Sequence, residues 1–226
     1  MQHIVVLSGA GMSAESGIKT FRDADGLWEG HDVMEVASPQ GFKNNPDLVY
    51  DFYNQRRKQL FEVSPNKGHQ LLADLEKDYK LSIVTQNVDD LHERAGSTNV
   101  LHLHGELRKA RSIKNESYVV DWDKDLTELN KDDKGNPLRP HIVWFGEAVP
   151  MLDNAVNVVS QADIVLIIGT SLQVYPAASL FQYAKVGTPV YYIDPKPASE
   201  IPSNVSVIKK GASEGLHDFI EAIKSL

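Results

Sequence analysis

The chain has 226 residues, with 23 Lys and Arg against 31 Asp and Glu, a formal net charge of −8 and 42% hydrophobic residues. This composition is typical of a folded globular protein and excludes a disordered or fibrous chain. The acidic balance argues against binding nucleic acid through phosphate contacts, and it is compatible with lysine-bearing partners. The sequence has no cysteine, which excludes disulfides, a thiol nucleophile and Cys-based zinc or iron–sulfur sites.

The start of the chain carries no targeting signal that we can identify. It runs into the apolar segment Ile4-Val5-Val6-Leu7 without a basic region or a cleavage site. No apolar run approaches the roughly 18 residues of a membrane span. We therefore expect a cytoplasmic protein that binds neither membrane nor nucleic acid directly, with a monomer as the favoured oligomeric state.

Short β-branched runs alternate with segments of helical spacing along the chain. Each run is bounded by Gly, Pro or polar residues, as is typical of buried parallel strands. The predicted strands are residues 3–7, 81–85, 164–168 and 190–193. The predicted helices are residues 46–63, 66–78, 151–162, 176–186 and 214–226. This alternation indicates an α/β fold with right-handed crossovers.

Two stretches interrupt the alternation, and we expect them to form a second, smaller lobe. Residues 23 to about 63 combine loop and helix without a strand, whereas residues 108 to about 139 are dense in charge and should be partly mobile. The sequence therefore predicts two domains. The large domain would comprise residues 1–23, 64–107 and 140–226, and the small lobe residues 24–63 and 108–139.

A glycine-rich turn follows the first predicted strand. The segment Gly9-Ala10-Gly11-Met12-Ser13-Ala14 matches G-x-G-x-x-A and should open a helix, a setting in which backbone N–H groups can approach a pyrophosphate. A tight turn without a ligand would give the same pattern. In an ordinary dehydrogenase a strand ending in an acidic residue would follow about 20 positions on. Residues 17–23 do not form such a strand, and the acidic strand-end residue is Asp194, which could hold ribose hydroxyls or cap the turn before Pro195.

Polar residues also gather at two other places, one after the strand predicted at 81–85 and one in an alternating segment that contains His102 and His104. The segment from Thr85 to His92 gathers amides and carboxylates where open α/β sheets bind ligands, although Asn87 or Asp89 could instead cap a helix. Further on, alternation places His102 and His104 on one face. An imidazole can act as a general base near neutral pH, and a His-x-His pair could also bind metal, but no cysteine or clear carboxylate partner is nearby.

The order of these motifs resembles that of the sirtuin family. Together the matching strings span nearly the whole chain. They are GAGMSAESGIKTFRDADGLW at 9–28, TQNVDDLHERAG at 85–96, HLHGEL at 102–107, PHIVWFGE at 140–147, GTSLQVYPAA at 169–178 and YYID ending at Asp194.

The resemblance implies an NAD-dependent protein lysine deacylase, with a Rossmann-like parallel-sheet large domain, a smaller inserted lobe and NAD between them. Its partners would be acyl-lysine proteins, whose acyl group passes to ADP-ribose as nicotinamide leaves. His104 would be the general base, with Asn87 and Asp89 orienting the departure of nicotinamide. The implied NAD-binding residues are Gly9, Ala10, Gly11, Glu15, Phe21, Arg22, Trp28, Gln86, Asn87, Asp89, Gly169, Thr170, Ser171, Asp194 and Ala212. The implied acyl-lysine tunnel is formed by Val143, Trp144, Phe145 and Gly146.

Two details concern the family pattern. Most sirtuins hold a structural zinc on four cysteines in the small lobe, but this interval has none, and Ser112 stands about where the first would be. We therefore expect no zinc. Because such a zinc contributes folding energy, the lobe must instead be held by apolar contacts or be less stable. The candidate contacts are Leu107, Tyr118, Val120, Trp122 and Leu138.

The second detail is a Tyr-x-x-Arg pair in the helix predicted at 46–63. Tyr53 and Arg56 share a helix face, and the segment resembles the sirtuin class that accepts acidic acyl chains, in which a small residue, here Ala37, widens the pocket. A guanidinium can bind a carboxylate through two hydrogen bonds. The pair predicts removal of succinyl and malonyl groups besides acetyl, although Arg56 could also belong to a solvated basic face.

Two other functions compete with an active deacylase. A binding module could have kept an NAD or ADP-ribose pocket and lost turnover, but the Asn87, Asp89 and His104 set argues against it. A Rossmann oxidoreductase is disfavoured by the missing strand after the first glycine turn.

Overall fold

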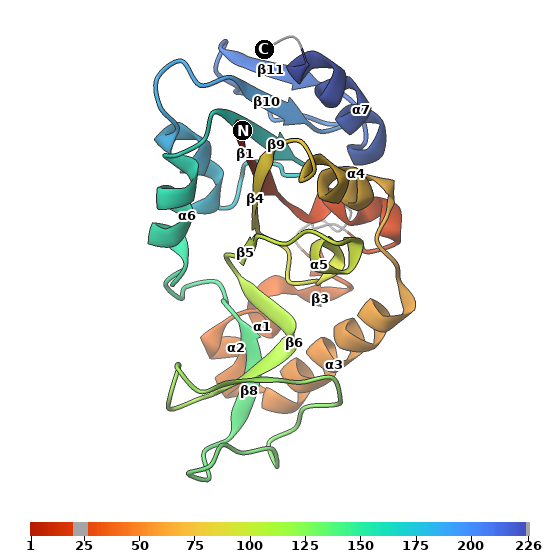
Figure 1. Cartoon of the computed structure of the whole chain (residues 1–226). Helices are drawn as coiled ribbons and strands as arrows, with labels where there is room; N and C mark the ends of the chain where they lie inside the picture. Colours follow the sequence, from red (N-terminus) through yellow and green to blue (C-terminus); the bar gives the residue numbers. More distant parts are fainter. Residues whose placement is uncertain (20–26, 225–226) are drawn as a thin grey trace.

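The computed structural model describes residues 1–19 and 27–224, and its centre is a parallel sheet of six strands in the order β11-β10-β9-β1-β4-β5 (Figure 1). All five neighbouring pairs are parallel, as the alternation of strands and helices predicts. The strands are β1 His3–Ser8, β4 Lys80–Thr85, β5 Val100–His102, β9 Ile164–Ile168, β10 Val190–Ile193 and β11 Val205–Ile208. The four predicted strands are confirmed. The apolar pattern does not predict β5 and β11, which are short and only partly buried edge strands.

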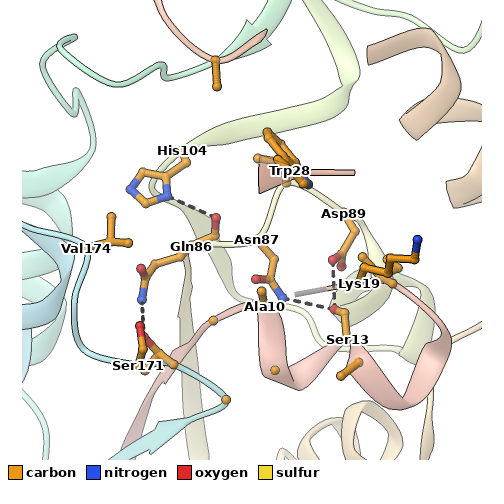
Figure 2. Close-up of a pocket in the computed structure, with 18 of the residues that line it drawn as sticks. Ala10, Ser13, Lys19, Trp28, Gln86, Asn87, Asp89, His104, Ser171 and Val174 are labelled. Carbon is orange, nitrogen blue, oxygen red and sulfur yellow. Dashed lines mark hydrogen bonds between the residues drawn. The ribbon is translucent and has the colours of Figure 1, made fainter. Parts of the chain in front are cut away.

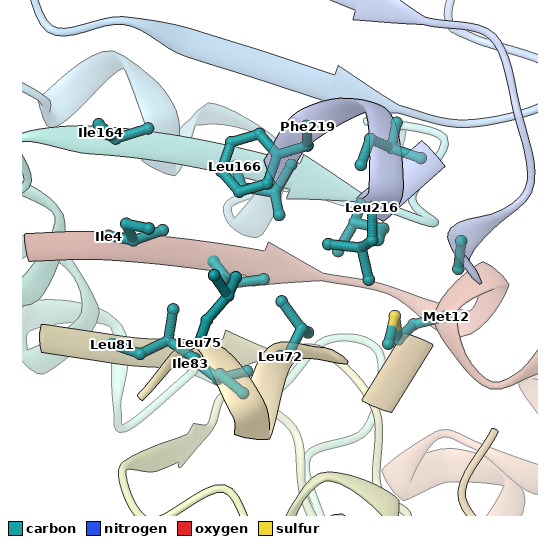
Figure 3. Packing of buried hydrophobic residues seen from close by; sticks show 14 of the residues in the cluster. Ile4, Met12, Leu72, Leu75, Leu81, Ile83, Ile164, Leu166, Leu216 and Phe219 are labelled. Carbon is teal, nitrogen blue, oxygen red and sulfur yellow. The ribbon is translucent and has the colours of Figure 1, made fainter. Parts of the chain in front are cut away.

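Helices cover both faces of this sheet. On one face Ile4, Leu81 and Ile83 pack against Leu72 and Leu216 (Figure 3). The opposite face packs against another helix pair through residues such as Val165 and Val159. The helices on the first face are α4 Lys67–Leu75 and α7 Ala212–Ile223, and those on the second are α6 Leu152–Val159 and the 3₁₀ helix η4 Ala177–Tyr183. Because both faces are covered, β1 and β9 are buried along their whole length, and β9 is apolar throughout.

The remaining elements form a smaller assembly below the sheet in Figure 1. The long helix α3 begins at Pro46, where Asn45 caps it, and ends at Glu62, close to its predicted bounds. It packs against an antiparallel sheet in the order β7-β6-β8. The other elements here are β2 Leu27–Trp28, β3 His31–Asp32, α1 Val33–Val36, α2 Pro39–Asn44, β6 Gly105–Ser112, β7 Val119–Asp121 and β8 Leu138–Ile142. The domain boundaries given above stay predictions.

Three local predictions are wrong. The stretch from 23 to 63 does contain strands, since β2 and β3 form a short antiparallel pair. The segment 176–186 holds the 3₁₀ helix η4 in place of an α-helix. The glycine turn after β1 leads into two 3₁₀ turns, η1 Ala10–Met12 and η2 Ala14–Ser16, because Gly17 adopts a left-handed φ of 93° and ends the second after three residues.

Apolar contacts hold the small antiparallel sheet, as predicted for Tyr118, Val120, Trp122 and Leu138, which gather around Tyr50. Leu107 belongs instead to a neighbouring cluster around Tyr53. Ser112 and its surroundings add a polar contact that the sequence analysis did not anticipate.

The carboxylate of Asp132 is the centre of that contact. It accepts the Ser112 hydroxyl at 2.7 Å, the Asn136 side-chain amide at 2.9 Å and the backbone N–H groups of Lys134 and Asn136. These bonds outweigh the effect of burial and lower the pKa of Asp132 to about 2. A carboxylate with four donors therefore ties together the loop where the resemblance places metal ligands. In residues 1–19 and 27–224 no cluster of three or more His, Asp or Glu side chains is suited to a metal ion.

Two glycine turns interlock at the carboxyl ends of β1 and β9. The Gly9 N–H donates to the Ile168 carbonyl at 3.0 Å, and the Gly11 N–H donates to the Gly169 carbonyl at 2.8 Å. A Cβ on Gly11 would lie 2.8 Å from the Gly169 Cα, and a Cβ on Gly169 would lie 2.3 Å from the Met12 nitrogen. The turns can therefore touch only because neither carries a side chain there.

No helix in the described part of the chain combines the length and the apolar character needed to span a bilayer.

We expect Gly169→Ala to lower the free energy of unfolding by about 2 to 4 kcal/mol, because it adds an overpacked contact to the cost of a left-handed residue. The matched control is Gly187→Ala, since Gly187 has a φ of 88° but open space around its Cβ position. That variant should lose about 1 kcal/mol. Urea unfolding followed by circular dichroism measures both, and equal losses would contradict the interlocking of the turns.

Candidate active site

A cavity of about 510 Å³ opens at the carboxyl ends of β1, β4 and β9 and extends to α3 and the segment after β8. Every predicted site residue that the structure describes lines it, from Gly9 in the first turn to Ala212 at the start of α7. Phe21 and Arg22 lie outside the described residues. A cavity of this volume is in the range of small-molecule and cofactor sites. The fold thus brings together residues more than 200 positions apart, and their individual roles stay predictions.

The glycine turn forms the floor of one end. Gly9 and Gly11 use their N–H groups in the contact with β9, whereas the Ala10 N–H donates to no backbone carbonyl among the described residues. Ala10 therefore offers the cavity a free backbone donor, the kind of group that binds a pyrophosphate. Gly9 and Gly11 thus allow the two turns to approach closely, whereas the G-x-G-x-x-A motif suggests that they bind a pyrophosphate.

Asn87, Asp89 and Ser13 form a buried chain of hydrogen bonds beside this turn (Figure 2). The Asn87 side-chain amide donates to the Ser13 hydroxyl at 3.1 Å, and that hydroxyl donates to an Asp89 carboxylate oxygen at 2.9 Å. Burial raises the pKa of Asp89, while the Ser13 bond works in the opposite direction. The other carboxylate oxygen of Asp89 accepts the Leu91 N–H, the first of the short helix α5 Leu91–Ala95, although the N-cap residue of this helix is Asp90. Asp89 thus bonds to the start of α5 and also lines the cavity.

Ser13 is a site residue that the sequence analysis did not identify. Its position in the glycine-rich turn was the available signal, but a serine after such a turn most often caps a helix. Only the approach of β4 to β1 shows that it joins Asn87 to Asp89, which lie 74 and 76 positions further on.

His104 lies across the cavity from the glycine turn (Figure 2). Its Nδ1 is 3.2 Å from the Gln86 carbonyl oxygen, which can only accept, so Nδ1 carries the proton and Nε2 is left as a basic nitrogen. Burial lowers the pKa of His104, which keeps the ring neutral at neutral pH. A neutral imidazole with a free Nε2 facing a cavity has the properties of a general base.

The neighbouring His102 has a different environment. Its ring nitrogens lie 2.9 Å from the Asn87 carbonyl and 2.8 Å from the Glu93 carboxylate. Burial alone would lower the pKa of His102, but these two partners raise it above the ordinary value. His102 is therefore a charged group that anchors the backbone of Asn87, and neither of its nitrogens is left for a metal.

The far end of the first turn meets β10 and α7. Asp194 is buried, and one of its oxygens accepts the Lys196 N–H at 2.8 Å, which is the turn-capping contact that the sequence analysis left open. Glu15 accepts bonds from the Ser213 hydroxyl and N–H and so caps the first turn of α7. Both carboxylates line the cavity, where they could also meet ribose hydroxyls.

The opposite end of the cavity is aromatic, with one cationic side chain. Tyr53 is fully buried and packs edge-on against Trp28, with ring centroids 6.0 Å apart. Arg56 lies one helical turn further on, and its guanidinium is 5.0 Å from the centroid of the Phe52 ring. Ala37 contributes only a methyl group to this wall.

The part of the cavity that adjoins the sheet offers groups suited to a dinucleotide. Ala10 provides a backbone N–H that has no carbonyl partner among the described residues, Asp194 and Glu15 provide carboxylates, and Gln86 and Asn87 provide amides. The residues present therefore fit NAD.

Comparison with known proteins gives a consistent result. A family model described as Sir2 family matches residues 9–176. An NAD-dependent protein deacylase of Helicobacter pylori (strain ATCC 700392 / 26695) is 61% identical over 223 residues, which cover 97% of this chain and 96% of that protein. The crystal structure of a Sir2 homolog–NAD complex is 42% identical with a TM-score of 0.87, covering 99% of this chain and 90% of the other. A Sir2 variant bound to a deacetylated p53 peptide and 3′-O-acetyl ADP-ribose is 28% identical with a TM-score of 0.82, covering 97% and 92%.

The two histidines should titrate on opposite sides of pH 6.5. We expect a midpoint below 6.5 for His104 and above 6.5 for His102. Because the folded pKa of His102 is raised, its stabilising effect is complete below pH 6.5 and is lost as the pH rises through the folded pKa. Glu93→Gln should lower the His102 midpoint and leave that of His104 in place. NMR titration of the imidazole protons measures all of this, and a His104 midpoint above 6.5 would contradict its burial as a neutral base.

Proposed function

The chain belongs to the Sir2 family and is an NAD-dependent protein deacylase, and on that premise we propose that it removes succinyl and malonyl groups, besides acetyl, from lysine side chains. The acyl group would pass to ADP-ribose as nicotinamide leaves. One observation supports the preference for acidic chains: the buried Nε of Arg56, at the aromatic end of the cavity, has no hydrogen-bond partner among the described residues.

The surroundings of Arg56 support a missing anionic partner. Among the described residues no carboxylate pairs with its guanidinium, whereas Lys58 on the same helix pairs with Asp125 at 3.1 Å. A guanidinium is always charged, and a buried donor without a partner costs free energy. The distal carboxylate of a succinyl or malonyl chain would supply that partner through a charge-assisted hydrogen bond.

Tyr53 and Ala37 are suited to the same ligand. Burial raises the pKa of the Tyr53 hydroxyl, which therefore remains a protonated donor for a carboxylate oxygen. Ala37 is buried in the cavity wall, and its small side chain leaves room for a chain longer than acetyl. The peptide backbone would lie along Val143, Phe145 and Gly146, in the segment that follows β8.

The chemistry requires the acyl-lysine oxygen to meet a sugar carbon from which nicotinamide departs. NAD supplies both the leaving nicotinamide and the ADP-ribose acceptor when it is bound. Asn87 and Asp89, fixed through Ser13, would orient the departing end, because their side chains are held by hydrogen bonds and cannot rotate freely. His104 would then take a proton from a ribose hydroxyl at Nε2, since its Nδ1–H is held by Gln86.

The acyl preference can be tested with three peptides of one sequence that carry acetyl-, succinyl- or malonyl-lysine. We expect Arg56→Met to lower kcat/KM for the acidic chains about 10- to 100-fold, as is typical of the loss of one charge-assisted hydrogen bond, and to change acetyl removal much less. Lys58→Met is the matched control, because it removes a charge from the exposed face of the same helix. Mass spectrometry of peptide and nicotinamide gives the rates. Acetyl removal alone by the wild type would refute the acidic preference.

Loss of the proposed base should separate turnover from binding. His104→Gln keeps a polar side chain of similar size, and we expect it to lower kcat about 10²- to 10⁴-fold while NAD still binds. Isothermal titration with NAD and single-turnover assays measure the two effects. A variant with near wild-type turnover would assign the base elsewhere, and wild-type protein that binds NAD but removes no acyl chain would indicate a binding module.

A further inference from the structure

We propose that Trp144 is a positioning residue for acyl-chain selectivity, because its indole N–H fixes the direction in which the Tyr53 hydroxyl donates. This inference rests on the proposed removal of acidic chains and concerns the same end of the cavity. It assigns the selectivity to three side chains, namely Tyr53 and Arg56 on α3 and Trp144 in the segment after β8, so the Tyr-x-x-Arg pair is only a part of it.

The hydrogen bond between the two rings is the main observation. The Trp144 Nε1–H donates to the Tyr53 hydroxyl oxygen at 3.0 Å, and both side chains are almost completely buried. An indole nitrogen can only donate, so the phenol is the acceptor in this contact. The hydroxyl proton of Tyr53 must therefore point away from Trp144.

The Tyr53 proton has no protein acceptor in the described part of the chain. Tyr53 lines the cavity next to Arg56, and the only hydrogen bond in which its hydroxyl takes part is the one it accepts from Trp144. Tyr53 is one of the residues that line this end of the cavity, and among the described residues neither its hydroxyl proton nor the Nε of Arg56 has a protein acceptor. A distal carboxylate can accept from both groups, whereas the methyl end of an acetyl group offers neither of them an acceptor.

The indole is itself held firmly, so the direction of its N–H is fixed. The Arg139 guanidinium carbon lies 3.4 Å from the Trp144 ring centroid, and the Phe42 ring lies at 5.2 Å. Glu147 accepts the Trp144 backbone N–H at 2.8 Å and binds Arg139 through two bonds of 2.6 and 3.0 Å. Arg139 and Glu147 thereby clamp both the ring and the backbone of Trp144.

Removal of this N–H should affect acidic chains selectively. Trp144→Phe keeps an aromatic ring but frees the Tyr53 hydroxyl to rotate and leaves its oxygen without a donor. Trp144 also lines the peptide tunnel, so both activities can fall, and the informative quantity is the ratio of kcat/KM for succinyl- to acetyl-peptide. We expect that ratio to fall about 3- to 10-fold, mainly through the KM of the succinyl-peptide, in line with the loss of one neutral hydrogen bond.

A double-mutant cycle provides the control. In a Tyr53→Phe background there is no hydroxyl to orient, so the further change Trp144→Phe should leave the ratio unchanged. A fall of the ratio in both backgrounds would mean that Trp144 acts through another group and would overturn the inference. An unchanged ratio in the single variant would overturn it as well.

Two further measurements keep the test decisive. If Trp144→Phe gives no cooperative thermal unfolding, Arg139→Lys replaces it, because lysine keeps the charge but loses the planar contact with the indole. That variant should lower the ratio at least about 2-fold, and an unchanged ratio would refute the clamp. Wild-type and Arg56→Met rates in the same assay separate the two proposals: a succinyl preference that Arg56→Met abolishes but Trp144→Phe does not would reject only the role of Trp144.

Discussion

The contact between the glycine turns after β1 and β9 is the constraint on which the rest of the site depends. Hydrogen bonds from Gly9 and Gly11 join the two turns with no side chain between them. Because β1 and β9 pair in parallel, both turns lie at the same edge of the sheet, where strands of this fold class bind ligands. The turn contact uses the N–H groups of Gly9 and Gly11, and the Ala10 N–H between them donates to no carbonyl among the described residues.

Burial shifts the pKa values of two ionisable residues near the glycine turns. It raises the pKa of Asp89 and lowers that of His104, so both shifts favour the uncharged form of the group. His102, bonded to Glu93, carries the charge nearby, and it does so outside the space where the reaction would occur. At the aromatic end, by contrast, Arg56 is charged and has no carboxylate partner among the described residues. The cavity thus holds a neutral imidazole at one end and, at the other, a guanidinium without a carboxylate partner among the described residues.

The small lobe is held together by polar and apolar contacts. Its sequence has no cysteine, and the structure places four hydrogen-bond donors around the Asp132 carboxylate and an apolar cluster around Tyr50 and Leu138. The Tyr50 hydroxyl also donates to the Leu138 carbonyl at 2.7 Å, which ties α3 to β8. Tyr53 and Arg56 project from the same helix, and Trp144 follows the same strand. The same contacts therefore also tie together α3, which carries Tyr53 and Arg56, and β8, which Trp144 follows.

The sequence by itself determined the α/β class, four of the six central strands, the bounds of α3 and most of the residues that line the cavity. These features depend on local patterns, namely apolar periodicity, glycine spacing and motif order. Only the tertiary structure decided that Ser13 joins Asn87 to Asp89, that Trp144 donates to Tyr53 and that a carboxylate organises the lobe without cysteines. The bonds of Ser112 to Asp132, of Ser13 to Asn87 and Asp89, and of Trp144 to Tyr53 join residues 20 to 91 positions apart. A local pattern indicates whether a side chain will be buried. The packing of strands and helices that are distant in the chain decides which partner that side chain contacts.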